Sequence, residues 1–319
     1  MKARATHEEV RTAMNIWKPD PGETLLARSP VSFATGAASR VRGMRWFRDP
    51  ERNDIQHELT GWPDGPDFTA RSVGGATAQK GLRGVAKATG VAVMAMLSAA
   101  GGNVSGSSVA STDDGSDFPD DPANEVDDFP VLWAAPMTIA RTLPWQLDPG
   151  RIDEKHTSTH LIVTDRRLVV VVLPYDKRAF EHIDDEPIWQ CPLTDVASVV
   201  PRNFKDGNDF SITFADESWC RLKSFRRQKL MRYLAPRREL IPLGQLSPQQ
   251  QKRVLAFATE MQMPDSVSPN VTRNEGGRFH VEILLPSRLT SAFGATEVSI
   301  TMDTEGREID VDDYLPGDF

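Results

Sequence analysis

The sequence predicts a β-dominated α+β fold, in which a small β-barrel with a capping helix carries an Ala/Gly-rich helical insertion and a C-terminal β segment. Three observations predict it. From Phe129 onward, apolar runs of strand length follow one another, near 130–134, 138–146, 159–164, 167–173, 187–191, 196–201, 209–215 and 218–224. A basic helical stretch over 225–235 follows these runs, and the composition changes abruptly at residues 74–102.

The first part of the chain divides into a helix and a β/loop region. Residues 1–18 are predicted to form an amphipathic helix with Trp17 on its apolar face, and they lack the apolar core of a signal peptide. Residues 19–73 are rich in turns, with a short apolar strand expected around Thr24–Arg28. Since the chain has only two cysteines, which are not in a metal-binding spacing, the expected location is cytoplasmic.

Residues 74–102 are predicted to form a helix rich in Ala and Gly. Small residues recur at helical spacing on one face, at Gly84, Ala88, Ala92, Ala95 and Ala99. Three basic residues flank its start: Lys80, Arg83 and Lys87. The uncharged stretch 88–102 is shorter than the roughly 20 apolar residues that a membrane span needs. Two roles stay open, insertion into a membrane interface and packing against the chain's own fold or a partner.

An acidic, disordered linker is expected over residues 103–128. This segment combines Ser and Gly with eight acids between residues 113 and 128, and it contains no Lys or Arg. Such a composition repels itself and cannot bury an apolar core, so we expect no fixed structure there.

A β-hairpin is predicted for "STHLIVTDRRLVVVVLP", residues 158–174. Each apolar run has the length of a strand, and Asp165 is expected to close the tight turn by a hydrogen bond to its own backbone. Residues 168–172 are all apolar, so both faces of the second strand should be covered, one by a barrel core and the other by a helix.

The hairpin "LIVTDRRLVVVV" resembles the central hairpin of bacterial pleckstrin-homology-like and GRAM-like domains. Later pieces resemble that family in order: the strand pair "IWQCPLTDVASVVPR", the hairpin "NDFSITFADESWCRL" and the capping helix "SFRRQKLMRYLA". The resemblance implies a pleckstrin-homology-like barrel with its helix over residues 129–235. "DPGETLL" resembles the opening of the family's first strand, so an insertion divides the domain or Gly22-Glu23 belongs to another element.

Residues 236–319 are predicted to hold a helix and a C-terminal β segment. Ser247 is a candidate N-cap, with Pro248 at the first helical position and Gln250 completing a capping box. Alternating apolar residues over 279–285 and 298–302 predict strands, followed by a turn leading to Ile309 and Val311. The pattern leaves open whether this segment extends the barrel or forms a separate sheet.

No catalytic or metal-binding signature emerges, so no enzyme activity, cofactor or metal site is expected. His156 and His160 have helical spacing but precede a strand, and we expect an exposed pair there. The acids of "EHIDDE", residues 181–186, are interpreted as a solvated hairpin tip. The net charge of −8 and the pI near 5.4 argue against nucleic-acid binding.

The basic segment 221–238 carries the functional hypothesis. Four of its side chains are expected to project from the helix toward solvent: Arg226, Arg227, Lys229 and Arg232. They predict a non-enzymatic adaptor, peripheral at the inner face of the membrane, that binds an anionic surface with the Ala/Gly-rich segment. The alternatives are a soluble protein–protein assembly module, in which that segment packs against a partner or in a homo-oligomer, and a solvated basic face that docks the acidic linker.

Overall fold

The computed structural model describes residues 17–34, 46–65, 130–152, 157–176, 181–182, 185–204, 207–235, 238–262, 268–274, 276–285, 296–315 and 318. The expected Ala/Gly-rich helix and the acidic linker lie outside these residues, as does the N-terminal helix apart from Trp17 and Lys18. The predictions made for Lys80, Arg83 and Lys87 therefore fall on residues outside the described part.

The described chain is a mixed α and β structure in which strands predominate, as predicted, and its strands form open sheets. The first sheet has the order β1 (Leu25–Pro30), β5 (Thr157–Thr164), β6 (Arg167–Asp176), with β8 (Glu186–Pro192) and the short β7 (Glu181–His182) both pairing with β6. The strand expected around Thr24–Arg28 is thus the first strand of this sheet, because it pairs with β5 across a long insertion.

The second sheet combines short strands from the insertion with the strands that follow the hairpin. Its order is β3 (Trp46–Arg48), β4 (Pro130–Trp133), β11 (Trp219–Lys223), β10 (Asp209–Phe214), β9 (Val196–Arg202), and β2 (Ser32–Phe33) also pairs with β11. One apolar core lies between the first two sheets and includes residues of both. Helix α2 (Arg227–Leu234) closes its edge with Leu230, Tyr233 and Leu234.

The predicted hairpin is formed by β5 and β6, which are paired antiparallel. The pairing runs from Thr157 opposite Pro174 to Val163 opposite Leu168. Alternate residues of β6 are buried on opposite faces, because Leu168 and Val170 belong to the main core while Val169 and Val171 belong to a second cluster. Trp17 packs against this second cluster. Both faces of the strand are therefore covered, as its continuous apolar sequence predicts, but the described residues that pack on the second cluster are Trp17 and Leu25 and not the expected helix.

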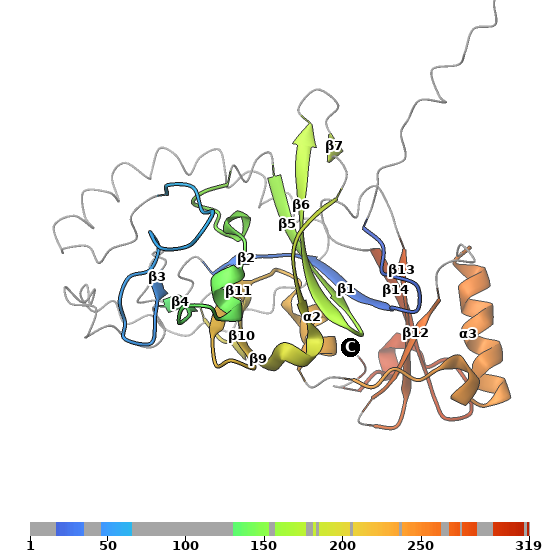
Figure 1. Cartoon of the computed structure of the whole chain (residues 1–319). Helices are drawn as coiled ribbons and strands as arrows, with labels where there is room; N and C mark the ends of the chain where they lie inside the picture. Colours follow the sequence, from blue (N-terminus) through green and yellow to red (C-terminus); the bar gives the residue numbers. More distant parts are fainter. Residues whose placement is uncertain are drawn as a thin grey trace, which may run out of the picture.

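The C-terminal β segment forms a separate sheet (Figure 1) and does not extend the first two sheets. Its antiparallel sheet has the order β12 (Asn270–Arg273), β13 (Phe279–Leu285), β14 (Thr296–Met302), and α3 (Pro248–Glu260) packs on it. The predicted capping box is present, since the Ser247 side chain accepts a hydrogen bond from the Gln250 amide and the Gln250 side chain accepts one from the Ser247 amide. We call α3 and this sheet the C-terminal unit, and the first two sheets with α2 the larger unit. In Figure 1, α2 lies on the side of the larger unit that faces the C-terminal unit.

The prediction of a strand over residues 138–146 is wrong. This segment forms two short 3₁₀ helices, Ile139–Thr142 and Trp145–Leu147. Side chains from the β10–β11 turn take the backbone donors that a strand would need: the Ile139 amide donates to Asp216 and the Ala140 amide to Ser218. The short strand β12 and the 3₁₀ helix Val311–Asp313 were not predicted either.

Within the described residues, no helix is long and apolar enough to cross a membrane.

Candidate functional site

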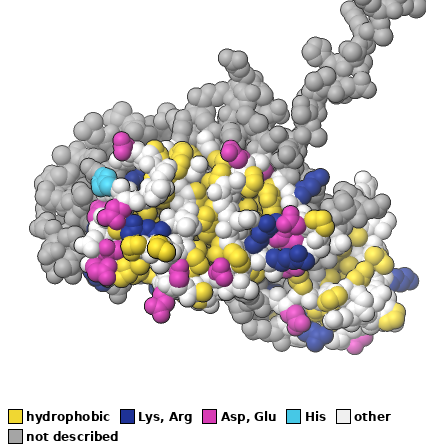
Figure 2. All heavy atoms as spheres, viewed as in Figure 1, with side chains coloured by type: hydrophobic (Ala, Val, Ile, Leu, Met, Phe, Trp, Pro, Cys, Tyr) yellow, Lys and Arg dark blue, Asp and Glu magenta, His cyan; other side chains and the backbone are white. Residues whose placement is uncertain are grey.

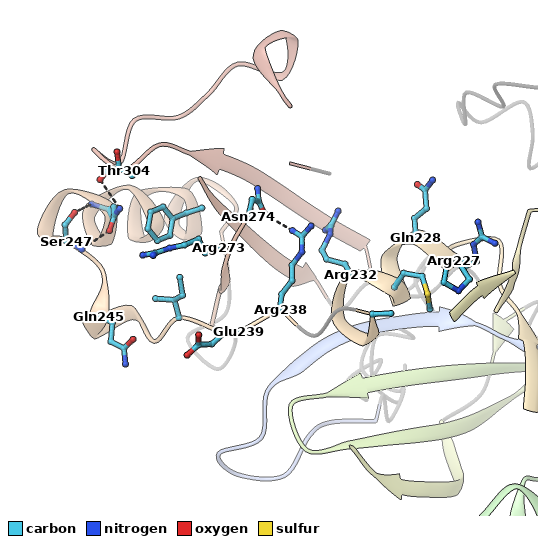
Figure 3. Close-up of a pocket in the computed structure, with 16 residues that line it drawn as sticks. Arg227, Gln228, Arg232, Arg238, Glu239, Gln245, Ser247, Arg273, Asn274 and Thr304 are labelled. Atoms are coloured by element: carbon cyan, nitrogen blue, oxygen red, sulfur yellow. Dashed lines mark hydrogen bonds between the residues drawn. The ribbon is translucent and has the colours of Figure 1, made fainter. Parts of the chain in front are cut away.

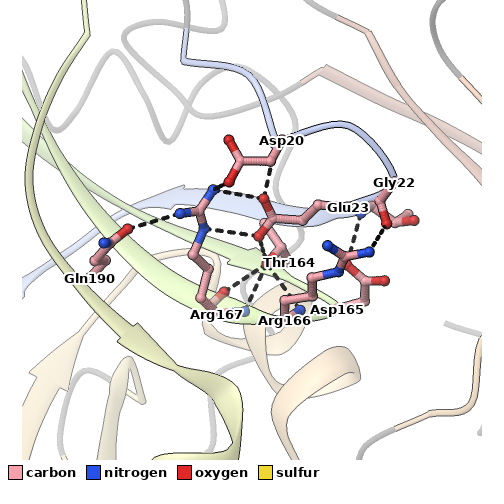
Figure 4. A network of polar contacts seen from close by, with 9 residues as sticks. Asp20, Gly22, Glu23, Thr164, Asp165, Arg166, Arg167 and Gln190 are labelled. Atoms are coloured by element: carbon pink, nitrogen blue, oxygen red, sulfur yellow. Dashed lines mark hydrogen bonds and ion pairs between the residues drawn. The ribbon is translucent and has the colours of Figure 1, made fainter.

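The turn of the β5–β6 hairpin is held by a network of polar side chains (Figure 4). Arg167 donates from its Nε and Nη2 atoms to the two carboxylate oxygens of Glu23, at 3.0 and 2.8 Å, and also binds Asp20. Burial acts to raise the pKa of Glu23, but the hydrogen bonds from Arg167 and Thr164 outweigh it and hold that pKa below its ordinary value. The network ties the Gly22-Glu23 segment to the hairpin.

The turn itself differs from the prediction in one respect. Thr164, not Asp165, closes it, since the Thr164 hydroxyl accepts hydrogen bonds from the amides of Arg166 and Arg167. The Asp165 carboxylate instead accepts a hydrogen bond from the Thr24 amide at 2.8 Å and helps to hold β1 in register. These contacts have a structural role.

A second polar group, buried beside the first sheet, corrects two expectations. His160 is fully buried rather than exposed, and its Nδ1 accepts a hydrogen bond from Arg28 at 3.0 Å. Arg28 also binds both carboxylate oxygens of Asp185, at 2.5 and 2.7 Å, so at least this acid of the expected solvated hairpin tip is a buried ion-pair partner. His156 lies outside the described residues.

Helix α2 meets the C-terminal sheet through a group of buried charged side chains. The Lys229 ammonium is an ion-pair partner of Glu297 and lies 3.7 Å from a carboxylate oxygen of Glu282. The Tyr233 hydroxyl donates to the other carboxylate oxygen of Glu282, which is completely buried. We call Lys229, Arg232, Tyr233, His280, Glu282 and Glu297 the interface cluster.

Burial controls the protonation of the interface cluster. Burial and the neighbouring Glu297 carboxylate raise the pKa of Glu282 to about 7, against the opposing attraction of Lys229. Burial and the nearby guanidinium of Arg232 lower the pKa of His280 to about 3, so this imidazole is neutral. An arginine can only donate, so the 3.0 Å contact of Arg232 Nη1 with His280 Nε2 places the ring proton on Nδ1.

A groove of about 1340 Å³ runs beside this cluster, between α2 and the C-terminal unit. Among the described residues, four arginines line it together with one acid, Glu239, and Figure 3 shows the arginines in this order: Arg273, Arg238, Arg232 and Arg227. We call it the arginine groove. Its volume exceeds the roughly 300–1,000 Å³ of sites for small ligands and leaves room for a segment of polypeptide.

Neighbouring groups hold the arginines of the groove in position. Arg227 donates to the carbonyl oxygens of Arg202 at 2.7 Å and Asp209 at 3.0 Å, and partial burial lowers its pKa. Arg238 donates to the Asn274 side chain at 2.6 Å. Arg273 is exposed and lies over the ring of Phe279, with 5.0 Å between the guanidinium carbon and the ring centroid. A carboxylate entering the groove would meet preoriented donors.

The residues proposed from the sequence are thus divided between two environments. Arg227 and Arg232 line the groove, whereas Lys229 is buried in the interface cluster, so the expectation that Lys229 projects toward solvent is wrong. Arg226 is half-buried at the start of α2, where its amide donates to Ser224. On the face shown in Figure 2, acidic side chains lie among the basic ones.

No family model, curated protein or solved structure matches this chain. Among the described residues, no group of three or more His, Cys, Asp or Glu side chains is placed to hold a metal ion.

Sequence reasoning missed the contribution of Arg273 to the groove and that of Glu282 and Glu297 to the cluster. Arg238 stands in the basic segment 221–238, but it was not singled out. No sequence signal marked Glu282: it stands on the polar side of the alternation in β13, where exposure is expected, yet its side chain is completely buried.

Proposed function

We propose that this chain is a non-enzymatic adaptor whose arginine groove binds an acidic segment of a protein partner. The observation that carries the proposal is the charge of the groove, whose described lining residues include four arginines and one glutamate. Charge-assisted hydrogen bonds to carboxylates are roughly twice as strong as neutral ones, and guanidinium groups bind carboxylates in a bidentate way. An extended acidic segment is the occupant that satisfies a row of such groups.

We also propose a pleckstrin-homology-like scaffold for the larger unit. The order of its elements along the chain supports this: β1, β5, β6 and β8 in one sheet, then β9, β10 and β11 in the next, then α2. This is the order that the resemblance of the hairpin and helix sequences implies. The contacts of Glu23 with Arg167 support assigning the "DPGETLL" strand to the same domain.

The arrangement of the basic residues favours a protein segment over a membrane surface. A flat anionic surface needs basic side chains that project together from the molecule. Lys229 is instead buried between Glu282 and Glu297, and the side chain of Arg232 is only 14% exposed. A narrow chain can enter between α2 and the C-terminal unit, where a bilayer surface cannot.

Fluorescence anisotropy with a labelled peptide of alternating Asp and Ser tests the proposal. Arg273→Gln should weaken binding about fivefold, as expected for the loss of one partly screened charge pair. Lys252→Gln is the matched control, because it removes an exposed positive charge from α3 outside the groove. Equal weakening by both changes would show nonspecific attraction and contradict the proposal.

Two further measurements test the alternative partners, a membrane surface and a second copy of the chain. Co-flotation with anionic liposomes that is lost in Arg273→Gln but kept in Lys252→Gln would favour the membrane-surface adaptor instead. Light scattering of the wild-type chain reports a second copy as the partner, and deletion of residues 74–102 tests whether the Ala/Gly-rich segment carries that association.

A further inference from the structure

We propose that the arginine groove is occupied in the resting chain by the chain's own acidic segment, residues 113–128, which an external partner must displace. This inference rests on the proposed function, because it names the first occupant of the same groove and a means of regulating it. Three observations support it: the charge of the segment, the unused donors of the groove and the place where the segment joins the fold.

The segment accounts for the whole negative excess of the chain. The sequence contains 45 acidic and 37 basic residues, and eight of the acids lie between residues 113 and 128. The remainder of the chain is therefore balanced, with as many acids as basic residues. A segment that holds all of the excess charge is the strongest candidate within this chain for a row of arginines.

The groove retains hydrogen-bonding capacity for such an occupant. Among the described residues, Arg273 is exposed and contacts the Phe279 ring but forms no ion pair. Arg227 uses its Nη1 for two backbone carbonyls and, within the described part of the chain, binds no carboxylate. Carboxylates entering the groove would supply the missing acceptors.

The segment also joins the fold on the correct side. It ends just before β4, which runs antiparallel to β11, pairing Trp133 with Trp219 and Leu132 with Cys220. The start of β4 therefore points toward the end of β11 from which the chain continues into α2. At that end of the sheet, Arg202 of β9 and Asp209 of β10 offer their carbonyl groups to Arg227.

The acidic segment is long enough to extend from β4 to the groove. From β4 to β9 the chain must cross three strand spacings of about 4.8 Å each, or about 14 Å. Sixteen extended residues span up to about 50 Å, so the segment can cross the sheet and still lie along the groove. A tether of this length gives an effective concentration on the order of 1 mM, which favours the internal segment over a dilute external one.

The test uses a labelled synthetic peptide with the sequence of residues 113–128 and three full-length chains. The first is the wild type. The second carries Asn or Gln at six acids of the segment: Asp113, Asp114, Asp117, Asp120, Asp121 and Glu125. The third is the charge-matched control, with the same neutralisation at six exposed acids elsewhere: Glu51, Asp64, Glu186, Glu217, Asp312 and Asp313.

The proposal predicts that the segment variant binds the peptide about tenfold more tightly than either the wild type or the control, because its internal competitor is gone. Adding Arg273→Gln to the segment variant should reverse part of this gain, whereas adding Lys252→Gln should not. Equal affinity of all three chains, still sensitive to Arg273→Gln, would overturn the internal docking and leave the groove as a binding site. Equal gains in the segment variant and the control would also overturn it. Absence of binding to every chain would instead contradict the proposed function itself.

Discussion

Replacing Glu282 by Gln tests the electrostatics of the interface cluster. Glu282 is completely buried, and its pKa rises from the ordinary value of 4.5 to about 7 in the folded chain. A carboxyl with a raised pKa binds protons more tightly in the folded state. Its contribution to stability is therefore fully present below pH 4.5 and is lost as the pH rises through about 7.

The expected magnitude follows from the size of the shift. At about 1.4 kcal/mol per pKa unit, ionising Glu282 costs the folded chain about 3 kcal/mol above pH 7. Glu282→Gln keeps an oxygen that can accept from Tyr233 but cannot ionise. The free energy of unfolding of the variant, relative to the wild type, should therefore rise by about 3 kcal/mol between pH 4.5 and pH 8.

Urea unfolding followed by circular dichroism at several pH values provides the assay. Glu305→Gln is the control, because it removes an exposed carboxylate from the same unit and should change stability by less than about 0.5 kcal/mol at every pH. If the curves of stability against pH run parallel for the wild type and Glu282→Gln, the buried carboxyl is not the titrating group and the reasoning is refuted.

Three further predictions concern the larger unit. Arg167→Gln removes the bidentate partner of the buried Glu23 carboxylate and should cost about 3 kcal/mol in urea unfolding, and an unchanged midpoint would exclude this role. Cys191 and Cys220 are buried, and burial raises the pKa of both thiols, to about 11 for Cys191. Neither thiol should therefore react with iodoacetamide at pH 8 until the chain is unfolded. Rapid labelling of the native chain would show a more open core. Val170→Ala should lower the free energy of unfolding by about 2 kcal/mol, and a loss below about 0.5 kcal/mol would mean that β6 is not packed on its core face.

The parts of the fold that were predicted correctly depend on local patterns. Two apolar runs of strand length predict the β5–β6 hairpin. Ser247 and Gln250 predict the start of α3, because each side chain accepts a hydrogen bond from the backbone amide of the other residue. The error at 138–146 has the opposite origin. Apolar residues there suggest a strand, but Asp216 and Ser218, more than seventy positions away, determine where the backbone donors bind.

The arginine groove was only partly accessible from the sequence for the same reason. Arg227 and Arg232 were recognised as basic residues of one helix, but their environment depends on the C-terminal unit. Arg232 meets His280 across 48 positions of sequence, and Lys229 is neutralised by Glu282 and Glu297, which belong to different strands. A helical pattern cannot distinguish a lysine that faces water from one that faces a buried glutamate.

The pairing of β1 with β5 has a consequence for the synthesis of the chain. The Thr24 amide binds a carboxylate that lies 141 residues later in the sequence. Ribosomes add about 5–20 residues per second, so roughly 7–28 s pass between the synthesis of these two residues. During that interval the apolar side chains of β1 have no sheet to join, and chaperones that bind exposed strands have time to act. Strand β1 is therefore synthesised early, but the first sheet can form only after β5 has been made.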